Sequence, residues 1–237
     1  MKKRINVLIA SFILTGTFLI VQSADAESKN NIDQLTVDSN NTIRGDITAK
    51  DGATVTIGDT DITNTQAKEV NIDIDNDLKK IKATDGTVNI GNVQLDNIQG
   101  AELVKVKTNN ISTSTIEATD GGVVDMGVVS VKNMKGGKVD IDTKNTANGK
   151  VTAENGGKVE LGKATVTDTT NADITIIADN TVNKVTSDGE GSLVSVGSTE
   201  LQGIEGGITK ITTTNKIDGT IKATDGSSVQ VGKTKVH

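Results

Sequence analysis

Apolar and polar residues alternate in short segments along most of this chain, and the alternation returns at a fixed interval. Alternation with a period of two is typical of half-buried β-strands. A core of Val, any residue, an apolar residue and Gly occurs six times, with its glycines 33 to 36 residues apart. The six glycines are Gly58, Gly91, Gly127, Gly162, Gly197 and Gly232. Self-similarity at a fixed period predicts a repeat architecture.

Each core follows a short apolar strand and a turn pair that favours positive φ. The turn pairs are Asp51-Gly52, Asp85-Gly86, Asp120-Gly121, Asn155-Gly156, Asp188-Gly189 and Asp225-Gly226. A further alternating strand fills the second half of each unit, as at residues 70–74 and 139–141. Because residues 136–141 resemble residues 156–161 twenty positions later, each unit is expected to hold two coils, of about 15 and 20 residues.

These features predict an all-β protein: a parallel β-helix or solenoid of about eleven coils, two per repeat of about 35 residues. At about 4.8 Å per coil the rod would be about 50 Å long. Residues 42–237 would form six repeat units, the last incomplete, and residues 27–41 a linker or an N-terminal cap. A string of small antiparallel modules is the alternative, but 35 residues are too few for each to close its own core.

The first 26 residues have the pattern of a secretory signal peptide. Three basic residues follow Met1, an apolar run extends from Ile5 to Val21, and an Ala-Asp-Ala sequence ends at Ala26. This order predicts cleavage after Ala26, with a membrane anchor as the alternative. Removing residues 1–26 takes away three basic residues and one acidic residue, so the net charge changes from −6 to −8.

The composition of residues 27–237 argues against most catalytic chemistry. They contain no Cys, Pro or aromatic residue, their one His is His237 and their one Arg is Arg44. The usual general base and soft metal ligands are therefore missing, which predicts a non-enzyme without cofactors or metals. The turn aspartates are explained by turn chemistry, and with two coils per unit they would lie too far apart to share a calcium ion. An acidic surface without a basic cluster predicts no binding to nucleic acid.

Two segments carry a resemblance to a known class of proteins. Gly121-Gly122-Val123-Val124-Asp125-Met126-Gly127 and Gly156-Gly157-Lys158-Val159-Glu160-Leu161-Gly162, with the Asn and Thr richness, resemble passenger repeats of bacterial autotransporters and filamentous-haemagglutinin-like adhesins. The resemblance implies a right-handed β-helix, exported across the outer membrane and used in attachment, aggregation, biofilm or virulence. The chain departs from that class because no part of it has the aromatic girdles of a translocator barrel.

Three hypotheses follow. The first is a secreted or surface-bound adhesin whose partners are a host or neighbouring cell, matrix or polysaccharide. The second is a self-assembling structural or S-layer-like fibre protein, a homo-oligomer formed by end-to-end stacking of coils, since an uncapped coil presents unpaired strand edges. The third is a polysaccharide-active β-helix that works with carboxylates alone. The last unit ends at His237 in mid-repeat, which fits either a piece of a longer protein or an open docking end.

Overall fold

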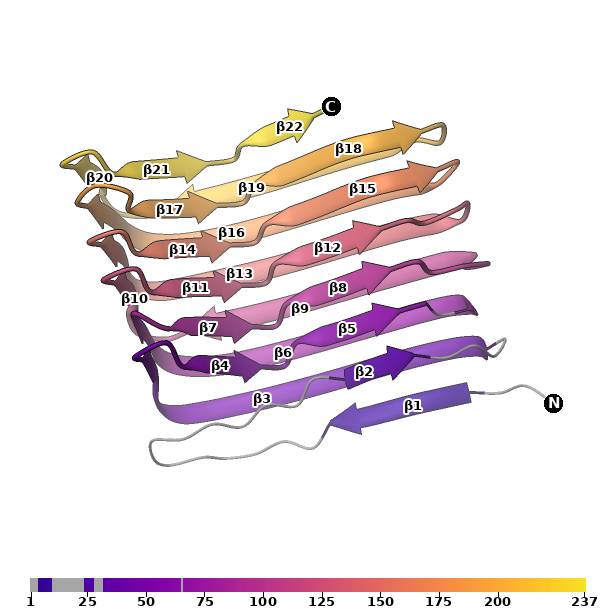
Figure 1. Ribbon diagram of the computed structural model, residues 1–237, viewed down its shortest axis with the longest axis horizontal. Coiled ribbons are helices and arrows are strands. Elements are labelled where there is room, and N and C mark those ends of the chain that lie inside the picture. The colour runs from indigo at the N-terminus through magenta and orange to yellow at the C-terminus, as the bar shows by residue number, and fades with distance from the viewer. Residues whose placement is uncertain (1–3, 10–23, 28–31, 65) are drawn as a thin grey trace.

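The protein is a parallel β-solenoid of about six coils (Figure 1). The structure, a computed structural model, describes residues 4–9, 24–27, 32–64 and 66–237, and side chains from Gln34 onward. No helix occurs in this part of the chain. The strands form three parallel sheets, and Figure 1 shows sheet A behind, with sheets B and C side by side in front of it.

Sheet A contains the long strands, and sheets B and C contain short ones. Sheet A consists of β1 (Arg4–Ile9), β3 (Ile32–Lys50), β6 (Ala67–Thr84), β9 (Leu103–Ser112), β10 (Ile116–Thr119), β13 (Lys138–Glu154), β16 (Asp173–Asp188), β19 (Thr209–Ile217) and β20 (Ile221–Thr224). Sheet C consists of β4 (Thr54–Ile57), β7 (Thr87–Ile90), β11 (Val123–Met126), β14 (Lys158–Leu161), β17 (Leu193–Val196) and β21 (Ser228–Val231). Sheet B consists of β2 (Ala24–Glu27), β5 (Thr60–Thr63), β8 (Val93–Asp96), β12 (Val129–Lys132), β15 (Ala164–Thr170), β18 (Thr199–Glu205) and β22 (Thr234–Val236).

Each 35-residue unit forms one coil, so the expectation of eleven coils, two per unit, is wrong. Val139 pairs with Val104 and Ile174, its equivalents one unit away, and Val159 pairs with Val124 and Val194 in the same way. The two similar halves of a unit therefore lie on opposite faces of one flattened coil. They resemble each other because each is a half-buried strand that faces the same interior. Six coils at about 4.8 Å give a stack of about 29 Å.

The interior between sheet A and the two front sheets holds two aliphatic clusters. One lies between the first half of each long strand and sheet B, and includes Leu35, Leu95 and Val139. The other lies between the second half and sheet C. Val124 and Val159 are fully buried in this second cluster, with Val55 and Val229 packed against it. These valines of the repeated segment therefore share one interior.

Both predicted domain boundaries, after residues 26 and 41, fall within strands of this fold. β3 runs from Ile32 across position 42 and forms the back of the first complete coil. Residues 1–3 and 10–23 of the predicted signal peptide lie outside the described residues. Its described parts are β1, which pairs with β3, and β2, which pairs with β5. Cleavage after Ala26 stays a prediction.

Candidate functional site

The turn aspartates form a column at one end of the coils, where the chain passes from sheet A to sheet C. Asp51, Asp85, Asp120 and Asp225 have φ between 45° and 54°, and the glycines after Asp51, Asp120 and Asp225 also have positive φ. Because each unit is one coil, neighbouring turns are stacked directly, contrary to the expectation that they would lie two coils apart. Asn155 Nδ2 donates to Asp120 Oδ1 at 3.0 Å. The column therefore joins turns of successive coils.

Asp188 differs from the other turn aspartates. Four residues separate β16 from β17, whereas three separate β13 from β14, and Asp188 is not among the residues with positive φ. Its carboxylate accepts a hydrogen bond from Thr224 Oγ1 in the next coil, and this bond lowers the pKa of Asp188. Ser192 Oγ, in the longer turn, donates to Asp188 O at 2.7 Å. In this turn Gly189 and Gly191 take the positive φ, while Asp188 is the last residue of β16, in register with Glu154 and Thr224.

A buried ladder of asparagine side chains lies between the two aliphatic clusters. One Asn from the middle of each long strand points inward, and each except Asn215 donates from Nδ2 to Oδ1 of the Asn in the next coil at 2.7 to 3.0 Å. The members are Asn41, Asn76, Asn110, Asn145, Asn180 and Asn215. Buried amides need hydrogen-bond partners, and here each amide supplies the next.

The repeat glycines lie directly opposite this ladder. A Cβ at Gly162 would come within 2.8 Å of Asn145 Nδ2 and would also collide with Asn180 Oδ1. Gly91, Gly127 and Gly197 meet their own pairs of asparagines in the same way. All six repeat glycines have φ between 59° and 67°. They lie where the chain passes from sheet C to sheet B, and they leave room for the amides.

Three carboxylates lie on the front face near this step. Burial raises the pKa of Asp59 to about 7, although the hydrogen bond that Asn92 N–H donates to Asp59 Oδ1 at 2.8 Å opposes the rise. Burial also raises the pKa of Asp125 to about 6, and the Glu160 carboxylate on the adjacent strand adds to the effect. Lys163 Nζ lies 3.5 Å from Glu160 Oε2. Carboxyls with raised pKa are one mark of acid–base sites, although structural positions produce them too.

The position of Asp59 is filled by Asn in the next coil. Asn92 Oδ1 accepts a hydrogen bond from Val128 N–H at 2.9 Å, just as Asp59 Oδ1 accepts one from Asn92 N–H. In these two coils a side-chain oxygen at this place thus binds a backbone amide of the following coil. This shared structural role accounts for the carboxylate of Asp59 without a role in catalysis.

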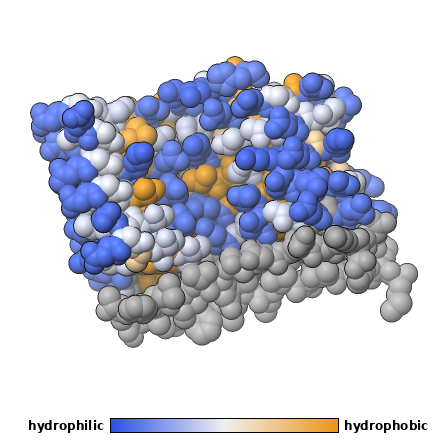
Figure 2. All heavy atoms as spheres, in the orientation of Figure 1, coloured by the Kyte–Doolittle hydropathy of each residue, from blue (hydrophilic) through white to orange (hydrophobic). Residues whose placement is uncertain are grey.

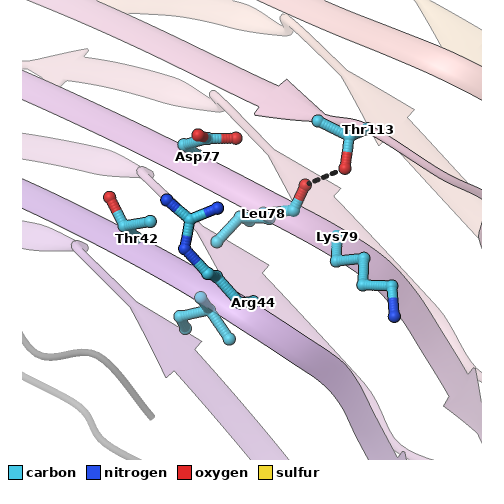
Figure 3. A pocket seen from close by; sticks show the side chains of 7 residues that line it. Thr42, Arg44, Asp77, Leu78, Lys79 and Thr113 are labelled. Atoms are coloured by element: carbon cyan, nitrogen blue, oxygen red, sulfur yellow. Dashed lines mark hydrogen bonds between the residues drawn. The ribbon is translucent and has the colours of Figure 1, made fainter. Parts of the chain in front are cut away.

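Two pockets lie outside the carboxylate group. One, of about 280 Å³, lies on sheet A beside the register shift between Ile43 and Asp46. Figure 3 shows Arg44 and Asp77 in it on neighbouring strands, with Thr113 Oγ1 donating to Leu78 O at 3.1 Å. The other, of about 680 Å³, lies at the coil ends opposite the Asp-Gly turns. It is lined mainly by polar side chains: Asn64, Asp96, Asn97, Gln99, Asn133, Lys135 and Asp168.

Charged side chains on the outer face of sheet A pair from coil to coil. Lys82 Nζ lies 2.8 Å from Glu117 Oε1, and Lys107 Nζ lies 3.3 Å from Asp73 Oδ1. On the opposite face, Figure 2 shows a mainly hydrophilic surface with small, separate apolar patches. The outer faces therefore present repeated polar columns.

The comparisons with known proteins leave the family open. The chain matches no family model, no curated protein and no solved structure. Within the described ranges, no three His, Cys, Asp or Glu side chains are grouped so that they could hold a metal ion. The same ranges contain no helix of the length and apolar character needed to cross a membrane.

Proposed function

We propose that this protein is an exported, non-enzymatic β-solenoid that acts as an adhesin of the autotransporter-passenger type, at the bacterial cell surface or after secretion. The observation that carries the proposal is the repetition of polar outer columns over a continuous aliphatic interior. A stiff scaffold of this kind offers the same side chains several times to one extended partner. Many weak contacts made together give a high total affinity.

The outer polar side chains support this proposal because many of them bind side chains of the next coil and so help to hold the coils together. The ion pairs of Lys82 and Lys107 and the bond of Asn155 to Asp120 each join successive coils. A right-handed coil is part of the proposal, since crossovers between parallel strands of one sheet are nearly always right-handed. The partner would be a cell surface, matrix or polysaccharide rather than nucleic acid, because the chain carries a net negative charge.

Binding of the purified chain to cells, matrix proteins and polysaccharides tests the proposal. Folded protein should bind at least one of these surfaces and heat-unfolded protein should lose most of that binding. Turnover of a polysaccharide that disappears in Asp59→Asn or Asp125→Asn would instead favour the carboxylate-dependent enzyme. Failure to bind any surface would overturn the adhesin proposal.

A second candidate function is a self-assembling structural or S-layer-like fibre. The specific observation is that each coil repeats the strands and the register of its neighbours, as Val139 pairs with both Val104 and Ile174. Strands of this kind pair through their backbone with strands of another chain when an edge is free. Light scattering that grows with protein concentration in the absence of any other surface would favour this candidate.

A further inference from the structure

The larger of the two pockets lies where the chain passes from sheet B back to sheet A, at the right of Figure 1, where β8, β12 and β15 end. Its lining residues come from the coils of β5, β8, β12 and β15. At about 4.8 Å per step, the first and last of these coils are about 14 Å apart. The pocket, of about 680 Å³, therefore has room for several units of an extended polymer.

A network of side-chain hydrogen bonds holds the wall of this pocket in place. Asn97 Nδ2 donates to Asn64 Oδ1 at 2.8 Å, and Gln99 Nε2 donates to Asn97 Oδ1 at 3.0 Å. One coil further on, Asn133 Nδ2 donates to Asp96 Oδ1 at 2.7 Å. Because these side chains are already ordered, a ligand that binds them loses less conformational entropy.

The pocket also offers hydrogen-bonding groups that this network does not use. A primary amide has two N–H donors and an oxygen with two lone pairs, so Asn133 keeps one donor and its acceptor oxygen. Lys135 and Asp168 line the same pocket and are exposed. Neither of them pairs with another side chain among the described residues. Donors and acceptors therefore occur together in one pocket.

These groups match the hydroxyl groups of a sugar. A hydroxyl group both donates and accepts hydrogen bonds, as a primary amide does. The ionisable residues of the pocket are Asp96, Lys135 and Asp168, so it has no strong excess of either charge. This balance favours a neutral polysaccharide over a polyanion or a polycation. Residues 27–237 contain no aromatic side chain, so hydrogen bonds would hold the sugar rings.

An extended polypeptide fits this pocket less well. Peptides commonly bind by adding a strand to a free backbone edge, with pockets for alternate side chains. Here the backbone N–H groups of Asn97 and Asn133 already donate to Lys132 O and Thr167 O in the next coil, both at 3.2 Å. No apolar side chain of the described residues lines the pocket. Both features favour the sugar chain.

We propose that this pocket binds a neutral polysaccharide, which lies across successive coils and forms hydrogen bonds with Asn133, Lys135 and Asp168. The inference rests on the proposed function, because it gives the adhesin one class of partner and one place to bind it. Contacts made on several coils to one polymer act together, so their combined affinity exceeds that of a single sugar unit.

Calorimetric titration of the full chain with neutral oligosaccharides tests the proposal. The probes are cellohexaose, xylohexaose, maltohexaose and N-acetylated chitohexaose, which differ in sugar and linkage and are long enough to cross the pocket. We expect saturable binding of at least one probe. Absence of binding by all of them would overturn the proposal.

Asn133→Gly removes one of the binding amides without straining the backbone. Asn133 has φ 53°, and the corresponding residue two coils later is Gly203, with φ 61°. The affinity for the bound probe should fall by about fivefold or more, as expected for the loss of one or two hydrogen bonds. Lys135→Ala should weaken binding by a similar factor.

Asn155→Gly is the matched control at the opposite end of the coils. Asn155 is also exposed, has φ 50° and donates from Nδ2 to Asp120 Oδ1 at 3.0 Å, much as Asn133 donates to an aspartate of the coil before it. Lys144→Ala, at an exposed position of β13, is the control for Lys135→Ala. Both controls should bind the probe like wild type, and circular dichroism checks that every variant is folded.

Unchanged affinity of Asn133→Gly and Lys135→Ala would overturn the proposal, and so would equal losses in their controls. Weaker binding of Asn133→Gly to gelatin, with its sugar binding intact, would assign the pocket to a polypeptide and would also overturn it. Attachment to surfaces is measured separately. A chain that attaches to cells but binds no probe retains the adhesin proposal and loses this inference. A chain that binds a probe through the pocket but attaches to no cell, matrix or immobilised polysaccharide does the reverse.

Discussion

Replacing Gly162 by Ala should destabilise the protein far more than replacing Gly121 by Ala. Both glycines have positive φ, at 67° and 80°. A Cβ at Gly121 would meet nothing within 4 Å, whereas a Cβ at Gly162 would collide with the side chains of Asn145 and Asn180. The pair therefore separates the cost of the backbone conformation from the cost of disturbing the asparagine ladder.

The magnitude follows from the two contributions. An L-residue in the left-handed region costs about 1–2 kcal/mol, which both variants carry. Only Gly162→Ala also breaks the 3.0 Å bond from Asn145 Nδ2 to Asn180 Oδ1. Each buried polar group left without a partner costs about 1–3 kcal/mol, so separating this donor from this acceptor should add a loss of about 2–6 kcal/mol.

Urea denaturation followed by far-UV circular dichroism measures both free energies of unfolding. Combining Gly162→Ala with Asn180→Ala should reduce the additional cost, because the smaller side chain leaves room for the new methyl group. Equal losses in Gly162→Ala and Gly121→Ala would refute the reasoning, since backbone strain alone would then account for the repeat glycines.

Three further predictions concern single side chains. Because burial raises the folded-state pKa of Asp59 to about 7, the protonated carboxyl stabilises the fold fully below about pH 4, and this stabilisation is lost as the pH rises to 7. Asp59→Asn should therefore be more stable than wild type at pH 8, by up to about 4 kcal/mol, and similar to it at pH 4. Thermal melts at both pH values measure the difference, and Asp142→Asn, at an exposed position, is the control. Thr143 Oγ1 is buried without a hydrogen-bond partner among the described residues, so Thr143→Val should raise the free energy of unfolding by about 1 kcal/mol in urea titrations. Lys82→Ala should lower it by less than about 1 kcal/mol, since the pair with Glu117 is partly exposed, and a loss above 2 kcal/mol would contradict that view.

The sequence predicts the parallel solenoid well because two of its signals are local. Alternating Val and Ile positions define the inward face of each strand, and Asp-Gly pairs define one end of each coil. The buried column through Val88, Val124 and Val159 is the direct result of that alternation. Both signals can be read within a few residues, so they need no knowledge of which strands pair.

The coil count could not be obtained in this way, because it depends on which strands pair. Residues 136–141 and 156–161 share a pattern because both strands face the same interior. They do not stack on each other. Coils of 20 and 15 residues would pair Val139 with Val159 and Val159 with Ile174, whereas the structure pairs Val139 and Val159 with residues 35 positions away. Both pairings place the same side chains in the interior, so the alternation of apolar and polar residues cannot distinguish a 35-residue coil from two shorter ones.

The asparagine ladder carried a signal that was missed. Asn110, Asn145, Asn180 and Asn215 recur at intervals of 35 within alternating strands, on the face of each strand that also carries its Val and Ile. A polar residue that recurs at an inward position indicates a buried hydrogen-bonded column. The Asn richness served above only as part of a resemblance to adhesin repeats, and no spacing within one unit shows that a Gly on the opposite strand faces the asparagine.

Gly and Asn together explain why the coils stack in one register. Columns of Val and Ile would tolerate a slip of two residues, because such a slip keeps the same faces inside. After a slip of two residues between β13 and β16, Asn145 would face Ala178 or Val182 in place of Asn180 and would lose its hydrogen bond to that amide. Each amide group left unpaired in this way costs about 1–3 kcal/mol. Aliphatic packing accounts for the stability of this solenoid, and the ladder opposite the glycines restricts it to one alignment.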